Sequence, residues 1–442
     1  MAGEKATKPA EIGEVPAHWE VGQLSVFTSR ITYGFTNPMP TTDEGPFMLT
    51  AKDVNGGRIV YENARRTSWE AFRNELTDKS RPRVGDVLLT KDGSIGRVAL
   101  CDRPDVCINQ SVALLQPNER IEPRFLKFLL EVPHYQQRME GDADGTTIKH
   151  IYITRVDKMQ VAVPPIAEQK AIAAVLGTLD DKIELNRRMN ATLEAMARAL
   201  FQSWFVDFDP VRAKLDGREP TGLDPATAAL FPERLEDSLL GHIPKGWEVK
   251  AVGDIGGVIC GKTPPTSVSD YYGDDIPFIT IPDMHGNVFG AATARKLSHA
   301  GANSQANKTL PPGSLCVSCI ATPGLVVITS EDSQTNQQIN SVVPHQKEET
   351  YFWYWVMTGL GAEIASSGSG GSVLVNLSKG RFETLQVIKP LHALIRAYHT
   401  TVRPLFETIL ANTHQSRTLA TLRDTLLPKL LSGKLSASQT PL

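Results

Sequence analysis

One segment of the chain fits the pattern of a phosphate-binding loop. Gly256–Thr263 reads Gly-Gly-Val-Ile-Cys-Gly-Lys-Thr, which matches G-x-x-x-x-G-K-[ST]. Such a loop binds phosphate only if a helix starts at the lysine, because the backbone N–H groups and the dipole of that helix must face the phosphates. Pro264 and Pro265 follow directly; neither has a backbone N–H, and the first disfavours helical geometry at Thr263. The sequence therefore argues against an ATPase that uses this segment.

The other residues with catalytic chemistry do not form a complete set. Cys316 and Cys319 make a lone C-x-x-C without a second pair, and in a strand their side chains would point to opposite faces. Asp180-Asp181-Lys182 has the residue types of a nuclease site, but it lies in a helical pattern, where we expect a solvated face. An adenine methyltransferase would need Asn/Asp-Pro-Pro-Tyr/Phe, and neither 37–40 nor 163–166 qualifies. We therefore expect no catalytic residue, no metal site and no cofactor on this chain, and a function in binding.

Composition narrows the class of protein further. The net charge of −3 excludes a protein that coats nucleic acid by bulk charge, but it leaves room for a local basic face. Five cysteines in 442 residues indicate reduced thiols. No apolar run approaches the ~18 residues of a membrane span, and the polar start at Met1–Lys5 has no signal core. We expect a cytoplasmic protein without a membrane partner.

Basic and polar side chains gather in two stretches. Arginine and lysine are frequent between residues 58 and 103, where acids are interspersed, so a solvated surface is the alternative interpretation. A polar and aromatic stretch runs from Thr263 to Asn287. Such side chains on exposed loops are what contacts to base edges require. The candidate DNA-binding residues are Arg30, Tyr33, Lys52, Arg58, Arg65, Arg66, Lys91, Ser94, Arg97, Lys149, Lys262, Thr263, Tyr271, Tyr272, His285, Asn287 and Lys308.

The chain repeats one plan twice. Four landmarks recur in the same order, displaced by 226 to 228 residues, which is too long a period for a solenoid. We therefore expect two homologous halves, each large enough for its own core. The matched segments are 16–21 with 244–249, 85–89 with 313–317, 109–110 with 336–337, and 145–164 with 371–390.

Each half ends in a long apolar stripe with steps of four and three residues, which predicts a long helix. Packing of each helix on its own domain is the plain alternative. Both stripes place an asparagine at the same step, and a polar residue in such a seam fixes register, so we expect the helices to pair. Pro404 should kink the second helix or delay its start. The predicted seam residues are Ile172, Leu176, Leu179, Ile183, Asn186, Leu193, Leu200, Val402, Leu405, Ile409, Asn412, Leu419 and Leu426.

The globular parts mix short strands and helices without β-α-β alternation, which indicates an α+β class. Residues 87–100 predict a hairpin around Asp92-Gly93, with Lys91–Ser94 on an exposed tip. The predicted divisions are a first globular domain at 1–165, a helix at 166–207, a connector at 208–240, a second domain at 241–390, a helix at 391–433 and a disordered tail at 434–442.

Several segments together carry a family resemblance. They are Ile-Gly-Glu-Val-Pro-Ala-His-Trp-Glu-Val (12–21) with its echo at 241–249, the hairpin at 85–96, Asn-Gln-Ser-Val-Ala (109–113), Thr-Asn-Gln-Gln (335–338), the stretch at 263–279, and Pro-Pro-Ile-Ala-Glu-Gln-Lys-Ala-Ile (164–172). The chain resembles, from about residue 11 to 433, the DNA-specificity subunit of type I restriction–modification enzymes. Leu391-His392-Ala393-Leu394 departs from the family's Pro-x-x-Glu-Gln, and Cys316–Cys319 replaces a more polar hairpin.

The resemblance implies two target-recognition domains separated by two long antiparallel coiled-coil helices with approximate two-fold symmetry. Each domain would read one half of a bipartite, asymmetric site in double-stranded DNA, and the helices would set the gap. Two methylation subunits carrying S-adenosylmethionine would dock on the helices, and restriction subunits would add ATP- and magnesium-dependent chemistry. The chain itself would be non-catalytic. The alternative is a two-headed protein-interaction scaffold that does not bind DNA; salt-dependent DNA binding would separate the two.

Overall fold

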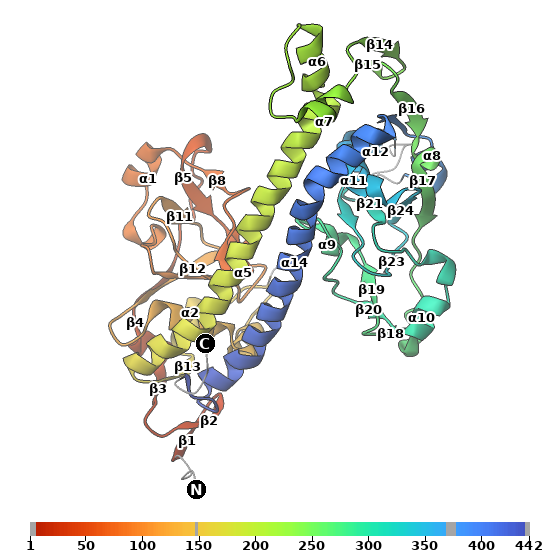
Figure 1. The fold of residues 1–442 in the computed structure, drawn as a ribbon. Coiled ribbons are helices and arrows are strands. Elements are labelled where there is room, and N and C mark those ends of the chain that lie inside the picture. Colours follow the sequence, from red (N-terminus) through yellow and green to blue (C-terminus); the bar gives the residue numbers. More distant parts are fainter. Residues whose placement is uncertain (1–5, 146–148, 368–376, 438–442) are drawn as a thin grey trace. The chain divides into compact units, whose positions relative to one another are not determined.

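The computed structural model describes residues 6–145, 149–367 and 377–437. The chain forms two units, one of Met1–Ile183 with Thr418–Leu442 and the other of Glu184–Arg417. Both boundaries fall inside long helices (Figure 1), so each unit consists of an α/β domain and a part of each long helix.

Unit 1 is built on a four-stranded sheet of order β10-β9-β12-β4 and a three-stranded sheet of order β11-β5-β8. Its strands are β1 (Thr7–Ala10), β2 (Gly13–Pro16), β3 (Glu20–Gln23), β4 (Thr28–Tyr33), β5 (Thr42–Leu49), β6 (Val54–Asn55), β7 (Arg58–Ile59), β8 (Arg65–Arg66), β9 (Val87–Thr90), β10 (Val98–Leu100), β11 (Val106–Ile108), β12 (Val112–Pro117) and β13 (Gln160–Val163). Its helices include α1 (Trp69–Asn74), α2 (Pro123–Glu131), α3 (Pro133–Gly141) and α4 (Ile153–Asp157).

Unit 2 has the sheet order β17-β24-β21-β22 and a second sheet of order β18-β20-β19-β23. Its strands are β14 (Leu235–Ser238), β15 (Gly241–Pro244), β16 (Glu248–Ala251), β17 (Gly256–Cys260), β18 (Tyr272–Gly273), β19 (Ile276–Ile279), β20 (Lys296–Leu297), β21 (Leu315–Ser318), β22 (Val326–Ile328), β23 (Gln334–Thr335), β24 (Ile339–Pro344) and β25 (Gln386–Lys389). Its helices include α6 (Asp209–Leu215), α7 (Pro225–Ala229), α8 (Val252–Ile255), α9 (Ile281–Met284), α10 (His299–Asn303), α11 (Thr350–Gly359), α12 (Gly361–Ser367) and α13 (Lys379–Glu383).

The two four-stranded sheets have the same topology. In each, an antiparallel hairpin pairs with a later strand, and that strand pairs with an earlier one, β4 in unit 1 and β17 in unit 2. In both second sheets, one strand is flanked by a parallel and an antiparallel neighbour. The repeat seen in the sequence is therefore a repeat of fold, and the expected α+β class with long helices is confirmed.

One small helical turn occurs at equivalent positions of both units with the same hydrogen bonds. Thr50 donates a hydrogen bond from its side chain to Asp53 Oδ2 at 2.7 Å, and its backbone N–H reaches the same oxygen at 2.8 Å. Thr280 and Asp283 form the same pair of bonds at 2.6 and 2.9 Å. This capping arrangement satisfies donors at the start of a helical turn. It follows the equivalent strands β5 and β19.

The predicted hairpin at 87–100 forms from β9 and β10. Gly96 has a φ of +86°, and a Cβ there would lie 2.5 Å from Gln136 Oε1. Gln136 on α3 donates from Nε2 to the carbonyl of Gly96 at 2.8 Å. The positive φ favours glycine at this turn, and any other residue would also displace the side chain of Gln136.

The hairpin tip differs from the prediction at one residue. Ser94 is exposed, but Lys91 is only 5% exposed. The prediction of Lys91 on an exposed tip is wrong, because Lys91 stands beside a strand end and its ammonium group is paired within unit 1 with Asp92, 3.0 Å away.

The long helices are α5 (Ile166–Phe201), which continues as a π-helix at Gln202–Val206, and α14 (His392–Leu431). Of the two effects predicted for Pro404, a delayed start does not occur, since α14 begins at His392 and runs on past Pro404; a kink stays a prediction. The predicted disordered tail is also wrong in part. Ala437 is 9% exposed and belongs to the core of unit 1, whereas residues 438–442 lie outside the described residues.

In unit 2 the helices pack antiparallel, because residues of α5 with rising numbers meet residues of α14 with falling numbers. Asn186 Nδ2 donates to Gln415 Oε1 at 2.9 Å, and Asn412 Nδ2 donates to Asn190 Oδ1 at 2.9 Å. Farther along, Tyr398 Oη donates to the carbonyl of Ala197 at 2.9 Å. Polar bonds inside the helix pair fix its register.

In unit 1 the same order holds, since Asp180 of α5 meets Arg423 of α14. The predicted seam residues lie on these paired faces to different depths. Ile172, Leu176, Asn186, Val402 and Ile409 are buried, whereas Leu179, Ile183, Leu193, Leu200, Leu405, Asn412, Leu419 and Leu426 are half-buried.

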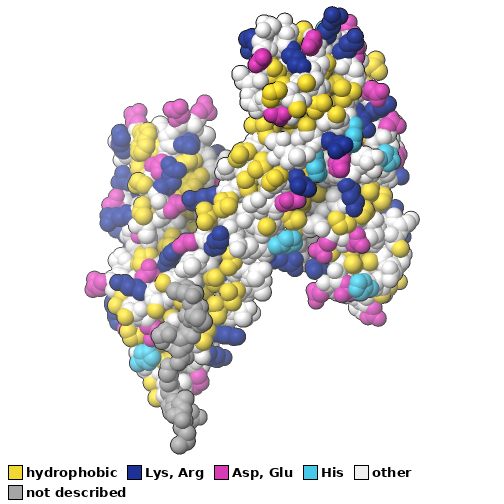
Figure 2. Space-filling model, in the orientation of Figure 1, with side chains coloured by type: hydrophobic (Ala, Val, Ile, Leu, Met, Phe, Trp, Pro, Cys, Tyr) yellow, Lys and Arg dark blue, Asp and Glu magenta, His cyan; other side chains and the backbone are white. Residues whose placement is uncertain are grey.

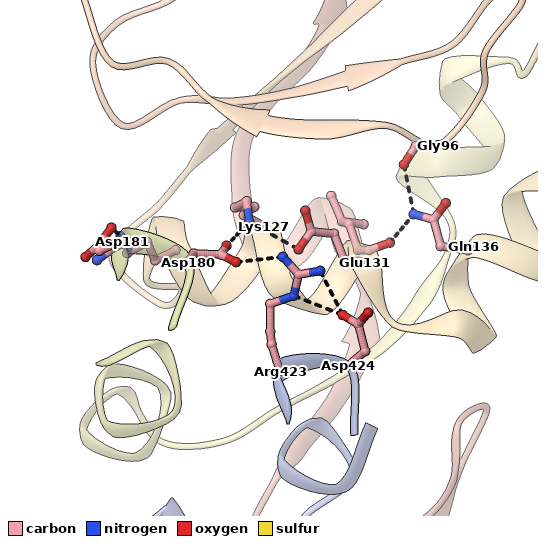
Figure 3. A network of polar contacts seen from close by, with 10 residues as sticks. Gly96, Lys127, Glu131, Gln136, Asp180, Asp181, Arg423 and Asp424 are labelled. Atoms are coloured by element: carbon pink, nitrogen blue, oxygen red, sulfur yellow. Dashed lines mark hydrogen bonds and ion pairs between the residues drawn. The ribbon is translucent and has the colours of Figure 1, made fainter. Parts of the chain in front are cut away.

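A charged cluster joins the α/β domain of unit 1 to both helices. Lys127 of α2 is 5% exposed and lies 2.8 Å from Asp180 and 3.2 Å from Glu131. Arg423 donates to Asp180 at 2.8 Å and to Asp424 at 2.8 Å. Figure 3 shows Lys127 and Arg423 on either side of Asp180. Although burial alone would raise it, Lys127 and Arg423 together hold the pKa of Asp180 below its usual value.

In unit 2, an aromatic cluster lies at the corresponding contact between the α/β domain and the long helices. The rings of Tyr351 and Phe406 stack with centroids 4.1 Å apart, and Tyr354 meets Phe406 edge-on at 5.8 Å. Phe205 contacts Phe352 at 4.9 Å. Rings at these separations attract beyond their burial of apolar area. In the described part of the chain, no helix is both long and apolar enough to cross a membrane.

Candidate nucleic-acid interface

Unit 1 has a cleft of about 510 Å³ at the ends of β4 and β9; most of its residues carry a polar group, but more of its surface is apolar than polar. Two of the predicted DNA-binding residues, Tyr33 and Lys91, line it. Both tyrosines of the cleft are accessible, Tyr33 at 41% and Tyr152 at 52% exposed. Exposed aromatic rings next to hydrogen-bonding groups can contact unpaired or paired bases and sugar edges. The full lining is Tyr33, Thr36, Lys91, Asp92, Gln110, His150, Tyr152, Ile153 and Thr154.

A charged triad forms the floor of this cleft. Lys91 Nζ lies 3.0 Å from Asp92 Oδ1 and 3.3 Å from His150 Nδ1, and His150 also contacts Asp92. The ammonium group of Lys91 stands 5.5 Å from the centre of the Tyr33 ring, and the His150 ring meets Tyr152 edge-on at 4.7 Å. The triad thus holds both accessible tyrosines, so Lys91 orients the cleft rather than projecting toward a ligand.

The other predicted residues of unit 1 lie outside the cleft lining. Arg66 is half-buried, with its guanidinium 3.8 Å from the centre of the Phe47 ring and a hydrogen bond to the Gly45 carbonyl. Arg58 pairs with Glu62 at 3.9 Å. The remaining ones are exposed, namely Arg30, Lys52, Arg65, Ser94, Arg97 and Lys149.

Unit 2 has its own polar cleft, of about 470 Å³, beside β18 and β20. Three cations, Arg295, Lys296 and Arg417, line it, and the Arg295 guanidinium lies 5.8 Å from the centre of the Tyr272 ring. Lys296 donates to the Asp274 carbonyl at 3.1 Å, and Arg417 donates to the Ala291 carbonyl at 3.2 Å. Three cations around one cleft suit an anionic ligand such as a phosphate backbone.

Of the residues predicted in unit 2, only Tyr272 lines this cleft. The Tyr272 hydroxyl donates to the Pro264 carbonyl, and Thr263 donates to Gln337 Oε1, both at 2.8 Å. Asn287 donates to the Asp283 carbonyl at 3.0 Å. Lys262, His285 and Asn287 are exposed, and Thr263, Tyr271, Tyr272 and Lys308 are half-buried.

Several cleft residues escaped prediction for identifiable reasons. Gln110 stands in the repeated Asn-Gln pair, so the repeat could have pointed to it. His150 and Tyr152 come from a segment far from Lys91 in sequence, and Arg417 comes from the long helix. Only the tertiary structure brings these segments together.

The segments with apparent catalytic motifs have other roles in the fold. Gly256–Cys260 is strand β17, and the chain continues without a helix at Lys262, so the loop lacks the geometry that phosphate binding needs. Cys316 and Cys319 are buried in different apolar clusters, one on each face of the sheet. Burial raises the pKa of the Cys319 thiol to about 11. Among the described residues, no group of three or more potential metal ligands lies together.

Comparison with known proteins identifies the family of this chain. The family model "Type I restriction modification DNA specificity domain" matches twice, at residues 39–195 and 244–392. The chain belongs to this family. The two matches fall on the two α/β domains; the first extends into α5, and the second ends at His392, where α14 begins.

Curated relatives extend over most of the chain. The type I restriction enzyme HindI specificity subunit of Haemophilus influenzae is 36% identical over 81% of this chain and 88% of its own length. The MjaIX specificity subunit of Methanocaldococcus jannaschii is 26% identical over 99% of this chain and 98% of its own length. A crystal structure of a type I restriction–modification S subunit from M. genitalium shares the fold, with a TM-score of 0.53 at 18% identity over 93% of this chain and 96% of that one.

Proposed function

We propose that this chain is the non-catalytic, DNA-reading subunit of a type I restriction–modification complex, with each α/β domain reading one half of a bipartite site. The observation that carries the proposal is that each unit has its own polar cleft with tyrosine and cationic side chains. Lysine and arginine would contact phosphates and position each domain, while the tyrosines and amides would contact base edges.

The two half-sites would differ in sequence, because the clefts differ in position and chemistry. The cleft of unit 1 lies at the ends of β4 and β9, and its polar groups are mostly neutral or paired. The cleft of unit 2 lies beside β20 and is lined by three cations. At the repeat displacement of 228, Tyr33 and Lys91 correspond to Gly261 and Cys319, so unit 2 lacks the counterpart of the first cleft. One duplicated fold thus presents two different reading surfaces.

The long helices would set the gap between the half-sites. At 1.5 Å per residue, the 36 residues of α5 and the 40 of α14 measure about 54 and 60 Å. Sites on duplex DNA repeat about every 34 Å along one face. The polar bonds between Asn186, Asn190 and Asn412 hold the helices in one register, as a spacer requires.

Partner subunits would bring the chemistry. We propose that two methylation subunits carrying S-adenosylmethionine dock on the helices, and that restriction subunits supply ATP- and magnesium-dependent steps in the cytoplasm. Exposed apolar side chains on α5 support such docking: Leu185 is 49%, Met189 38% and Met196 51% exposed. Their spacing puts them within about 40° on one helix face. Hydrophobic side chains are visible along the exposed side of α5 in Figure 2.

The proposal is tested by mapping methylated adenines in DNA from cells that express the chain with a methylation subunit. We expect a bipartite motif. Tyr33→Ala should relax the motif in one half-site only, whereas Arg295→Ala removes a cation that would contact phosphate and should weaken binding to all sequences about equally. Each lost base or phosphate contact should cost about 1–3 kcal/mol of binding free energy. If either single variant relaxed recognition in both half-sites, the two domains would not read their half-sites independently.

The salt dependence of DNA binding is the second measurement. The assembled methylation complex should bind its motif with an affinity that falls linearly on a log–log plot against salt concentration. Arg295→Ala should make that slope shallower by about one unit if Arg295 contacts a phosphate. An assembled complex that binds no DNA at low salt would contradict the proposal and favour a protein-interaction scaffold.

A further inference from the structure

Two lysines approach the ring of Tyr33 in the cleft of unit 1. The ammonium group of Lys91 lies 5.5 Å from the centre of the ring, and the ammonium group of Lys79 lies 5.6 Å from it. A cation within about 6 Å of an aromatic ring centre is attracted by the ring face. Both lysines therefore belong to the surroundings of one accessible cleft residue.

The two ammonium groups differ in how far the protein already occupies them. Lys91 is 5% exposed, and it pairs with Asp92 at 3.0 Å and contacts His150 at 3.3 Å. Lys79 is exposed, and within the described part of the chain it forms neither a hydrogen bond nor an ion pair. An exposed, unpaired cation can replace the counterions of a DNA phosphate, whereas a buried, paired one cannot. Lys79 is therefore a cation beside this cleft that is available to phosphate.

Gln110 supplies an unoccupied amide in the same cleft. It is exposed, it lines the cleft with Tyr33, and its side chain makes no hydrogen bond to any residue that the structure describes. Its backbone is fixed, because its N–H donates to the carbonyl of Phe35 at 2.9 Å. The preceding Asn109 accepts from the backbone N–H of Ser111 at 3.0 Å, a bond that stabilises a turn. The turn thus holds one free amide in place.

This turn packs directly against the end of β4. A Cβ on Gly34 would lie 1.7 Å from the carbonyl oxygen of Ile108 and 2.7 Å from that of Asn109. Both oxygens belong to the backbone, so rotation of a side chain would not relieve the clash. Glycine at this position therefore brings the turn with Gln110 close to the strand that ends in Tyr33.

Unit 2 keeps the turn, at Asn336–Gln338, but occupies its glutamine. Gln337 stands at a displacement of 227 from Gln110, and its Oε1 accepts a hydrogen bond from Thr263 at 2.8 Å. Thr36 holds the matching place in unit 1, where it lines the cleft without a hydrogen bond to Gln110. The free amide is thus a feature of unit 1, and its effect should be confined to one half-site.

We propose that Gln110 and Lys79 together recognise one A·T base pair and its backbone. The Gln110 amide donates to N7 and accepts from the N6 amino group of adenine in the major groove, the pairing that carboxamide geometry favours. The Lys79 ammonium group binds an adjoining phosphate, which positions the domain without specifying sequence. This inference rests on the proposed function, because it assigns roles within the cleft that would read one half-site.

Mapping of methylated adenines in cells that express the full chain with a methylation subunit tests the amide. Gln110→Ala should leave one A·T position, other than the methylated one, unspecified in one half-site. Gln110→Glu keeps the shape but offers only acceptors, so the same position should change to C·G, because a carboxylate accepts from N4 of cytosine. Gln137→Ala is the matched control and should leave the motif unchanged, since Gln137 is exposed on α3 outside the cleft lining.

The salt dependence of DNA binding by the purified methylation complex tests the lysine. Lys79→Ala should make the slope of log affinity against log salt shallower by about one unit and leave the motif unchanged. Lys79→Arg keeps the charge and should keep the slope. Gln110→Ala removes no charge, so it should weaken binding to the original motif about tenfold at an unchanged slope. Both side chains are exposed and unpaired, so these variants should keep the thermal midpoint of the original chain.

The outcomes separate this inference from the proposed function. A lost base position in Gln110→Ala at the original slope, with a shallower slope in Lys79→Ala at the original motif, would support it. An unchanged motif in Gln110→Ala would overturn the adenine contact, and an unchanged slope in Lys79→Ala would overturn the phosphate contact. Either result leaves the proposed function intact if the original chain still directs methylation to a bipartite motif. An original chain that directs methylation to no such motif would overturn both.

Discussion

In each unit, an equivalent helix of the α/β domain packs against the long helices: α2 in unit 1 and α11 in unit 2. The side chains at these two contacts, which we call the joints, differ in kind. In unit 1 the joint is ionic, whereas in unit 2 it is aromatic and apolar. The repeat displacement matches the positions one to one: Lys127, Asp180 and Arg423 in unit 1 correspond to Tyr354, Phe406 and Ala197 in unit 2.

The difference teaches which properties the fold demands at this joint. The residue on the α/β domain is buried in both versions, since Lys127 is 5% and Tyr354 4% exposed. On the helices, Ala197 and Phe406 are fully buried, whereas the side chains of Asp180 and Arg423 are 21% and 25% exposed. The fold therefore keeps the burial of the domain residue, while the kind of interaction is free to change. A buried ion pair adds little net stability but restricts geometry through its hydrogen bonds. The aromatic joint gains stability from area and tolerates small shifts.

The largest expected effect comes from removing the centre of the aromatic joint. Phe406→Ala leaves a cavity among Tyr351, Tyr354 and Trp355 and should lower the free energy of unfolding of unit 2 by about 4 kcal/mol. Hydrogen exchange measured by mass spectrometry should rise in 350–359 and leave 123–131 unchanged. Equal loss of protection in both helices would show that the units do not have separate joints.

A somewhat smaller loss is expected when the ionic joint loses one partner. Arg423→Met keeps the apolar stem but leaves Asp180 with Lys127 alone, which should cost about 3 kcal/mol. Hydrogen exchange should then rise in 123–131. Arg188→Met is the matched control, since Arg188 is 70% exposed and pairs with Glu184 on the helix surface; there the change should stay below about 0.5 kcal/mol.

Exchanging the whole joint should cost less than breaking it. Lys127→Tyr, Asp180→Phe and Arg423→Ala together place the residues of unit 2 into unit 1. The exchange removes Asp180 together with both of its cationic partners, and only Glu131 and the exposed Asp424 lose a partner, so we expect stability within about 2 kcal/mol of the original chain. If the triple variant is less stable than Arg423→Met by urea unfolding, the joints are not interchangeable.

The sequence was sufficient for the repeat, the long helices and the seam between them, because these follow from periodicity that any packing must respect. The antiparallel direction of the helices came from the family resemblance. The sequence was insufficient for the ionic joint. Asp180 was expected on a solvated face, and Arg423 is a charged residue within the apolar stripe of the second long helix. Neither residue suggests its role when it is considered alone. Their positions are explained by the ion pair between them and by the contact of Asp180 with Lys127, which comes from a third element.

The prediction of the cleft residues was limited in the same way, because local sequence does not show contacts between distant segments. Tyr33, Lys91 and Tyr272 were predicted from residue type and local exposure, and they do line the clefts. His150 and Arg417 could not be predicted, because their places depend on long-range packing rather than on local pattern. Burial of Lys91 was missed for a related reason: Asp92 follows it in sequence, but His150, which completes the triad, comes from a distant segment.

The smallest effect concerns the acid at the edge of the ionic joint. Burial raises the pKa of Glu131, against the opposing attraction of Lys127. The folded state therefore holds this proton more tightly than the unfolded chain, whose glutamate titrates near about 4.3. Stability contributed by Glu131 should fall as pH rises from there through the raised folded value. Asp180, whose pKa is lowered, adds no slope in that range, because its contribution is lost only as pH falls below about 4.

Glu131→Gln should remove that slope. The amide keeps the shape of the side chain and can still accept a hydrogen bond from Lys127, so below about pH 4.3 the variant should match the original chain. At pH 8 it should be more stable than the original chain, because the raised pKa of Glu131 no longer costs stability. Urea unfolding between about pH 4 and 8 measures the difference, with Asp181→Asn as control, since Asp181 is 63% exposed and outside the buried cluster. A slope that persists in Glu131→Gln would mean that another group titrates at the joint, and that the ionic version is not sensitive to pH through this carboxyl.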